Sequence, residues 1–366
     1  MPPYSNTGVL NTESGVLKNM QDFSEILKNG LSCRIDWLSF TILEGDDVEA
    51  VLDDFGFLMS DFHTCPKGAN GYRQMLLLNG STLRVLYDGN EGMGVHFDVS
   101  GSAMSDLFMY FRRSLEVSTP FGTDAIDMDV QIMSELLTRV DRLGHVTRLD
   151  LAIDNVNDIF FSLDDLVDIL KAQQFVSKFR SWRDLSEYTT SGDVKGHTLY
   201  LGSRTSDIML RVYDKQAEQG VGFPWVRWEL ELKDQRASQA LALMLSGASI
   251  GSICLGILKN YFRIIILDDV NKSRCSTDIE YARFLSGVES LRLYIPKADK
   301  TLDDKREWIV RQVMPTMTAL IMANDGDISF LTNEIDVHAG RMSRKLQQMV
   351  TAKNPNWRDE LFDLTH

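Results

Sequence analysis

A tyrosine between two basic residues is the pattern in this sequence with the most evident chemistry. Arg211, Tyr213 and Lys215 alternate along a predicted strand, Asp207–Lys215, and therefore share one face. Two further strands are predicted on either side of it, at His197–Ser203 and Trp225–Lys233. Together with acids on a neighbouring strand, this face suits a tyrosine that attacks a phosphodiester beside a carboxylate-bound metal.

Acidic side chains occupy one face of two more predicted strands. Alternation along Trp225–Lys233 places four residues on one face: Trp225, Arg227, Glu229 and Glu231. The segment VTRLDLAID does the same at residues 146–154, with Arg148, Asp150, Ala152 and Asp154 on one face and leucine and isoleucine opposite. Aspartate is disfavoured inside strands, and two on one face repel unless solvent, a cation or an arginine compensates. An ordinary exposed face with salt bridges is the alternative interpretation. The convergence of acidic faces on two strands with the Tyr213 pattern on a third favours a chemical site.

Composition limits the function classes that are open to this chain. It has 366 residues, 44% hydrophobic and 25% charged, and a formal net charge of −14. This composition is typical of globular proteins, and the chain is long enough for two or three domains. The longest apolar run, Ile250–Leu258, is far shorter than the roughly 20 residues of a membrane span, and no secretory signal is evident. We therefore expect a soluble cytoplasmic protein without membrane partners. The negative charge argues against a generic nucleic-acid coat but leaves room for local basic patches.

Two basic segments could contact nucleic acid. Lys178, Arg180 and Arg183 cluster around Phe179 and Trp182, a mixture that suits base stacking and phosphate contact. The predicted helix 338–353 contains four basic residues and no acid: Arg341, Arg344, Lys345 and Lys353. Such a helix could dock on duplex DNA or could simply complement an acidic surface.

The core of the sequence contains a duplicated unit. RIDWL at 34–38 resembles RLDLA at 148–152, and each is followed by an acidic helical stretch, 46–55 and 163–173. LLLNGS at 76–81 then corresponds to LYLGS at 199–203, LRVLYD at 83–88 to LRVYD at 210–214 with one extra residue, and VHFDV at 95–99 to VRWEL at 226–230. A helix follows each time, at 102–114 and 236–245. We predict an α+β fold in which two strand–helix–multistrand–helix units form antiparallel sheets about a pseudo-twofold axis, either merging their sheets or facing them across a groove.

Four regions follow from this pattern. Residues 1–30 are predicted to be a flexible tail with one short helix near 20–28, and residues 31–145 are the first repeat, which lacks the Tyr-x-Lys spacing and the Glu-x-Glu pair. Residues 146–250 form the second repeat, which carries the candidate site. Residues 251–366 are predicted to be a helical region for DNA binding or dimerisation, with Pro315 kinking or dividing a helix over 303–322.

Several other chemistries lack their motifs. The sequence has no GxxxxGK[ST] loop, no GxSxG elbow, no HExxH and no His-hydrophobe-His pair. Carboxylates would have to hold any metal, and hard oxygen ligands favour Mg²⁺ or Mn²⁺ over zinc.

RIDWLSFT, TRLDLAID and above all LYLGSRTSDIMLRVYDK with WVRWELELK resemble the Rep_trans family of rolling-circle replication initiators, over about residues 34–245. The resemblance implies that Tyr213 nicks one strand at an origin and stays on the 5′ phosphate, with Tyr200 as the nearest rival. It maps an acidic metal site onto Asp150, Glu229 and Glu231, leaves Asp154 a structural role, and gives Arg211 and Lys215 the scissile phosphate. The DNA-binding residues that we expect are Arg148, Arg204, Arg227, Arg341, Arg344 and Lys345.

The predicted function is therefore a metal-dependent DNA nicking-closing enzyme that starts rolling-circle replication of a phage or plasmid. Attack by Tyr213 would free a 3′-hydroxyl for a host polymerase, with a host helicase as a further partner and a homodimer as one assembly. A conjugative relaxase has the same chemistry on a different element. A DNA-binding regulator that keeps the scaffold without catalysis is the alternative from another class.

Overall fold

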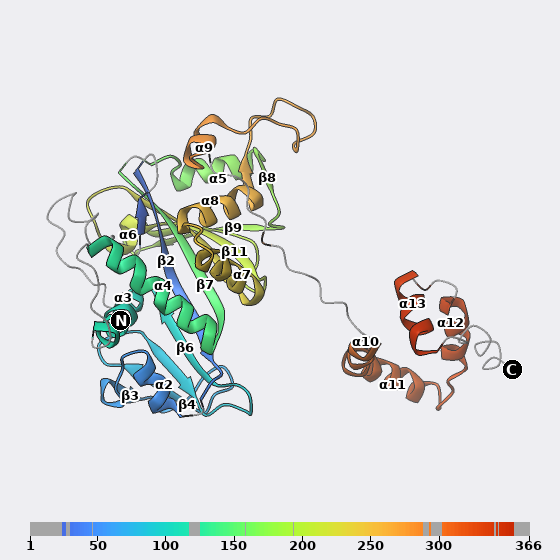
Figure 1. The fold of residues 1–366 in the computed structure, drawn as a ribbon. Coiled ribbons are helices and arrows are strands. Elements are labelled where there is room, and N and C mark those ends of the chain that lie inside the picture. The colour runs from blue at the N-terminus through green and yellow to red at the C-terminus, as the bar shows by residue number, and fades with distance from the viewer. Residues whose placement is uncertain are drawn as a thin grey trace. The chain divides into compact units, whose positions relative to one another are not determined.

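The structure is a computed structural model of the chain. It describes residues 24–26, 30–45, 47–116, 125–157, 159–192, 194–287, 293, 302–339, 342 and 344–354. The chain divides into two compact units, residues 1–295 and 296–366 (Figure 1). Each unit is described by itself below.

The larger unit is built on one sheet, which contains eleven strands within the described part of the chain. These strands are β1 (Ser24–Ile26), β2 (Leu31–Ile42), β3 (Phe62–Thr64), β4 (Gln74–Leu78), β5 (Arg84–Tyr87), β6 (Val95–Ser100), β7 (Gly144–Val156), β9 (Trp182–Tyr188), β10 (Val194–Leu201), β11 (Ile208–Asp214) and β12 (Trp225–Lys233). Two short strands, β8 (Phe175–Ser177) and β13 (Phe262–Ile264), form a second, antiparallel sheet.

The order of the strands confirms the duplication. The sheet runs β3-β4-β5-β6-β2 and then β7-β12-β11-β10-β9, so each half reads as the reverse of the other about the β2–β7 pair. Chain order matches as well, because β2 and β7, β4 and β10, β5 and β11, and β6 and β12 are the segments that the sequence paired. All these ladders are antiparallel. The two repeats therefore merge their sheets instead of facing each other across a groove.

The helices repeat in the same way. They are α2 (Val48–Asp54), α3 (Ala103–Glu116) and α4 (Ala125–Leu143) in the first half, and α5 (Leu163–Lys171), α6 (Lys215–Gln219), α7 (Asp234–Leu245), α8 (Ile250–Tyr261) and α9 (Ile279–Phe284) in the second. Asp47 caps α2 and Ser162 caps α5, at corresponding positions after β2 and β7. Helices α3, α4, α7 and α8 contact the central strands β2 and β7 or their neighbours β6 and β12 (Figure 1).

The core lies between these helices and the apolar face of the sheet. Leu149, Leu151 and Ile153 of β7 are completely buried, as the alternating pattern predicts. At the start of β7, Gly144 lies so close to β2 that an added Cβ would be 1.8 Å from the carbonyl oxygen of Thr41. A glycine is therefore required where the two central strands meet.

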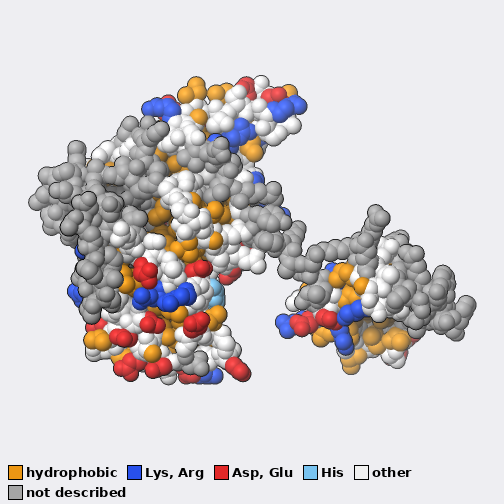
Figure 2. Space-filling view, in the orientation of Figure 1, with side chains coloured by type: hydrophobic (Ala, Val, Ile, Leu, Met, Phe, Trp, Pro, Cys, Tyr) orange, Lys and Arg blue, Asp and Glu red, His pale blue; other side chains and the backbone are white. Residues whose placement is uncertain are grey.

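The smaller unit is helical. Its helices are α10 (Leu302–Trp308), α11 (Met314–Ala323), α12 (Ser329–Ala339) and α13 (Arg344–Lys353), with a π-helical turn at Ile309–Val313. Pro315 does not break the helix: residues 302–323 are continuously helical, and a π-helical turn at Ile309–Val313 lies immediately before α11, which begins one residue ahead of Pro315. Figure 2 shows hydrophobic side chains on the surface of this unit, and Trp308 and Met322 are among the exposed ones. No described helix of the protein combines the length and the apolarity that a bilayer crossing needs.

Three expectations about organisation differ from the structure. The short helix expected near residues 20–28 is a strand at Ser24–Ile26, which pairs with β2, and most of the predicted tail lies outside the described residues. The helical region expected from residue 251 begins instead after residue 295, because α8 and β13 belong to the larger unit. Helix α4 was not predicted, although its buried residues Ile132, Leu136 and Val140 have helical spacing.

Candidate active site

Three adjacent strands, β7, β12 and β11, bring the predicted site residues together on one face of the sheet. Across β12 and β7, Glu231 lies opposite Asp150. Across β11 and β12, Arg211 lies opposite Glu229, and Tyr213 lies opposite Arg227. Directly opposed residues of an antiparallel pair point to the same side, so the ladder itself sets this cluster.

The hydroxyl of Tyr213 points at a carboxylate. It donates a hydrogen bond to Oε2 of Glu229 at 3.1 Å, while Arg211 binds the other oxygen, Oε1. Burial raises the pKa of Tyr213 well above 10.0; the Arg227 charge opposes this effect without overcoming it. Tyr213 is therefore a neutral phenol near neutral pH, and its proton is already directed at a carboxylate that could accept it.

Asp150 is the buried centre of a second group of contacts. Arg148 donates to both of its oxygens, at 2.9 and 2.6 Å, and also pairs with Glu231 at 3.0 Å. The Arg148 guanidinium stacks on the Trp37 ring, 3.9 Å from the ring centre. Burial raises the pKa of Asp150 well above 3.8, and the negative charge of Glu229 raises it further, despite the opposing effect of Arg148. Two acids thus crowd one arginine-lined site.

A third group of contacts was only partly visible in the sequence. Arg227 is 2% exposed and donates to both oxygens of Asp154, at 2.7 and 2.8 Å, and to Asp36. Asp154 also accepts a hydrogen bond from Trp225. Burial alone would raise the pKa of Asp36, but Arg227 and other nearby cations hold it below 3.8. Sequence reasoning missed Asp36, because a β-bulge in β2 beside Trp37 disturbs the alternation that would have placed it.

These contacts change the roles of two predicted residues. Arg227 was expected to contact DNA, but its guanidinium is buried between two carboxylates and so positions β7, β12 and β2 instead. Lys215 was expected to extend β11, but it is the first residue of α6 because Asp214 caps that helix. Its amino group pairs with Glu218 at 2.8 Å and lies 5.5 Å from the Tyr213 ring centre.

The remaining predicted DNA contacts lie elsewhere. Arg204 is in the turn between β10 and β11, beside Tyr200. Arg344 and Lys345 are the first residues of α13 in the smaller unit, whereas Arg341 lies outside the described residues. The rival nucleophile Tyr200 lies opposite Arg211 on β10 and is flanked by two arginine side chains.

The three carboxylates are ligands of the right type for a hard cation, but their present arrangement does not surround one. Asp150, Glu229 and Glu231 offer the oxygen donors that Mg²⁺ and Mn²⁺ prefer. Burial chiefly raises the pKa of Asp150, and the charge of Glu229, which raises it further, is a repulsion that a cation would relieve. Within the described residues, however, no three His, Cys, Asp or Glu side chains already surround a common point. Arg148 and Arg211 bind the oxygens that a cation would take.

The site therefore combines a tyrosine hydrogen-bonded to a carboxylate with clustered acids and arginines, on a duplicated antiparallel sheet. The sequence matches the replication initiation factor family, Rep_trans, over residues 144–335, from the first residue of β7 into α12. The chain belongs to this family.

Two known proteins resemble the chain over most of its length. The putative DNA relaxase NicK of Bacillus subtilis (strain 168) is 24% identical over 339 residues, which is 88% of this chain and 88% of that protein. The structure of a rolling circle replication initiator protein from Geobacillus stearothermophilus aligns with a TM-score of 0.60 and 29% identity, over 72% of this chain and 99% of that one.

Proposed function

We propose that this protein nicks one strand of its element's DNA through Tyr213 and so initiates rolling-circle replication. The observation that carries the proposal is the hydrogen bond from the Tyr213 hydroxyl to Glu229, whose other oxygen is bound by Arg211. In the reaction, Tyr213 Oη forms a bond to the phosphorus and the bond from phosphorus to the 3′ oxygen breaks. The products are a 5′-phosphotyrosyl linkage and a free 3′-hydroxyl after that oxygen gains a proton.

Each neighbouring residue has a part in this step. Glu229 accepts the phenol proton as Tyr213 attacks, because general base catalysis requires a base within hydrogen-bond reach of the proton. Arg211 is 28% exposed and can turn from Glu229 to the negatively charged phosphate. Lys215 lies near the tyrosine ring and adds positive charge there. Arg227 with Asp154 and Asp36 keeps the three strands in register.

We also propose that the reaction depends on Mg²⁺ or Mn²⁺ held by Asp150, Glu229 and Glu231. When bound, the metal would supply positive charge to the scissile phosphate. Its donors are the three carboxylates, and the cost of crowding them supports the assignment.

The smaller unit, residues 296–366, is the proposed contact with duplex origin DNA, with Arg344 and Lys345 at the start of α13 as contacts. A host helicase, a host polymerase and a second copy of the chain are the proposed partners of the nicked complex. A chain ended after residue 295 should retain its thermal midpoint for the larger unit and still cleave a short single-stranded oligonucleotide. It should have a lower affinity for duplex origin DNA, measured by gel shift. Retained duplex affinity would place origin recognition in the larger unit.

The central experiment is covalent capture. Wild-type protein is incubated with supercoiled DNA of its own element and Mn²⁺, and the mixture is then denatured in detergent. The DNA species are separated to detect nicked circles that carry covalently linked protein. Nicking with a retained adduct supports the enzyme, whereas tight binding without nicking supports a DNA-binding regulator. A conjugative relaxase remains the second candidate, favoured by the similarity to the putative DNA relaxase NicK over 88% of both chains. Extension of the free 3′-hydroxyl around the circle by a polymerase and helicase distinguishes an initiator from a relaxase that acts only at a transfer origin.

A further inference from the structure

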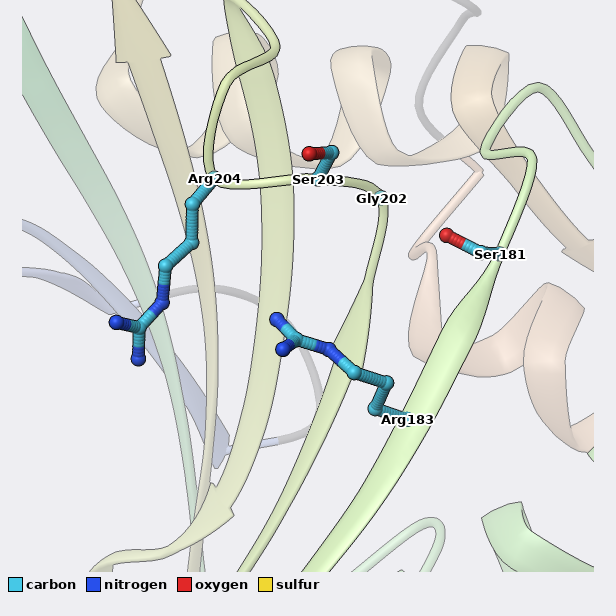
Figure 3. Close-up of a pocket in the computed structure, with 5 residues that line it drawn as sticks. All are labelled: Ser181, Arg183, Gly202, Ser203 and Arg204. Atoms are coloured by element: carbon cyan, nitrogen blue, oxygen red, sulfur yellow. The ribbon is translucent and has the colours of Figure 1, made fainter.

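A small open pocket lies at the edge of the sheet, two strands beyond the strand that carries Tyr213. It has a volume of about 200 Å³ and is lined by Ser181, Arg183, Gly202, Ser203 and Arg204. Arg183 comes from β9, and Arg204 comes from the turn between β10 and β11 (Figure 3). Figure 3 shows both arginine side chains extending along the same side of that turn.

The two pocket arginines differ from those of the active site because no carboxylate among the described residues forms an ion pair with them. Arg148, Arg211 and Arg227 each bind at least two acids. Within the described part of the chain, no ion pair joins Arg183 or Arg204 to an acid, and both side chains are exposed. Two exposed guanidinium groups without an internal counter-ion form a site for an external anion.

The guanidinium groups of both pocket arginines lie near the same aromatic ring. The guanidinium carbon of Arg183 is 5.2 Å from the centre of the Tyr200 ring, and that of Arg204 is 5.9 Å from it. Cation–π contacts of this kind orient the arginines before a ligand arrives. Gly202 shapes the wall of the pocket: its φ of +98° suits glycine, and its amide donates to the carbonyl of Ser181.

The pocket is connected to the catalytic residues through the sheet. Arg183 lies opposite Tyr200, Tyr200 opposite Arg211, and Arg211 opposite Glu229, so these side chains form one row across four strands. At about 4.8 Å per strand, the row places Arg183 roughly 10 Å from the strand of Tyr213. Lys233 adds a second link, because its amino group binds the carbonyl of Arg204 and pairs with Glu231.

The size and charge of the pocket select a compact anion. Sites for drug-sized ligands usually exceed about 300 Å³ and are mostly apolar, whereas this pocket is smaller and lined by two arginines and two serines. A phosphate group fits that description. The half-buried ring of Tyr200 beside it also suits the stacking of a nucleobase.

We propose that the Arg183–Arg204 pocket binds a backbone phosphate of the single-stranded DNA close to the scissile one, with a neighbouring base against Tyr200. This inference rests on the proposed nicking function and extends it by fixing the path of the strand. The DNA runs from Tyr213 past Arg211 and over Tyr200 to the outer edge of the sheet. Contacts on this side of the nick hold the strand while Tyr213 attacks.

The test measures oligonucleotide affinity as a function of salt. Full-length protein carrying Tyr213→Phe, which binds without forming an adduct, is titrated into a short fluorescent single-stranded oligonucleotide from the element's own origin. Adding Arg183→Gln and Arg204→Gln should weaken binding roughly tenfold. The slope of log affinity against log salt should fall by about 0.7 for each phosphate that the variant no longer neutralises. The matched control is Arg142→Gln, an exposed arginine in the last turn of α4 that does not line the pocket.

A second arm locates the phosphate. Single methylphosphonate linkages, which remove the charge of one phosphate, are placed in turn along the oligonucleotide. One position beside the nick should weaken binding to the parent protein and have no effect on the doubly substituted one. An oligonucleotide affinity equal to that of the Arg142→Gln control would overturn the proposal, as would a thermal shift with inorganic phosphate alone and no change in DNA affinity. Adduct formation by the wild-type protein is scored separately, so its absence counts against the nicking function and not against the pocket.

Discussion

The two halves of the sheet carry corresponding ion pairs in different surroundings. In the first half, Arg84 on β5 lies opposite and binds Asp98 on β6; in the second, Arg211 on β11 lies opposite and binds Glu229 on β12. Asp98 also accepts hydrogen bonds from Trp37 at 3.0 Å and from Ser39 at 2.9 Å. Asp98 is thus a single acid satisfied by three donors. Glu229 is instead crowded by Asp150 and shares its oxygens with Tyr213.

The tyrosines of the two halves differ by one position. Arg211 and Tyr213 are two residues apart and share the polar face of β11. In β5 an extra residue separates Arg84 from Tyr87, so Leu86 takes the polar face and Tyr87 packs against the hydrophobic core. A shift of one residue turns a side chain to the other face of a sheet. Two differences therefore distinguish the proposed reactive half from the structural half. The first is which face of the strand carries the tyrosine, and the second is the number of carboxylates next to the arginine.

The largest expected effect comes from removing the hydroxyl of Tyr213, compared with removing the hydroxyl of Tyr87. Tyr213→Phe should eliminate the detergent-resistant DNA adduct, a decrease of at least about a thousandfold, because the attacking atom is absent. Tyr87→Phe is the matched control and should leave the adduct yield unchanged. A gel assay with labelled oligonucleotide measures both. An adduct that persists in Tyr213→Phe would assign the chemistry to another tyrosine, with Tyr200 tested next.

The two equivalent acids should separate catalysis from stability. Glu229→Gln should slow adduct formation by about a hundredfold, because the variant has no carboxylate to accept the phenol proton. Asp98→Asn should leave the rate per folded molecule within about twofold but lower the free energy of unfolding by about 2 kcal/mol, since it leaves Arg84 without its charged partner. Urea unfolding and single-turnover cleavage supply the two readouts. Equal effects of both variants on the rate would remove the distinction between the halves.

Metal binding should stabilise the second half through its crowded acids. Mn²⁺ at about a hundred times its dissociation constant should raise the stability of the wild-type protein by about 2.7 kcal/mol. Asp150→Asn should abolish most of this rise, whereas Asp98→Asn should retain it. Differential scanning calorimetry with Mn²⁺ and then with excess chelator measures the change. An undiminished response in Asp150→Asn would exclude that carboxylate as a ligand.

The smallest expected effect is a pH dependence without metal. Burial first, and then the charge of Glu229, raise the pKa of Asp150 above 3.8, so ionising it costs more in the folded protein than in the unfolded chain. The contribution of Asp150 to the free energy of unfolding is therefore complete below about pH 3.8, and it is lost as the pH rises through the raised pKa of this carboxyl group. As the pH rises above about 3.8, the stability of Asp150→Asn should rise relative to that of the wild type. A constant difference across that range would contradict the raised pKa.

Strand alternation predicted much of this site because the contacts within it follow the ladder. The strand Trp225–Lys233 was predicted with its observed ends, and the acids and arginines of β7, β11 and β12 share the predicted face. The repeat pattern also predicted the pseudo-twofold, since each segment has an equivalent on the opposite side of β2 and β7.

Other features depend on contacts that no local pattern records. The bulge that brings Asp36 to Arg227 interrupts the alternation of β2, and the partners are 191 residues apart in the chain. Lys215 lies in α6 and not in the predicted strand, because Asp214 caps that helix and ends the two-residue alternation. The Arg183–Arg204 pocket required knowledge that β9 pairs with β10.

The central pairing of β2 with β7 also sets the order in which the chain can fold. Leu31 pairs with Asn155 and Ile42 with Gly144, so this ladder joins residues more than a hundred positions apart. During synthesis β2 emerges long before β7, so the backbone N–H and C=O groups along this edge of β2 stay unpaired until residue 156 has left the ribosome. Pairing at such separation slows folding, and an open strand edge invites association with other chains. A chaperone that shields the first repeat during this interval should therefore raise the yield of folded protein more than one that acts after release.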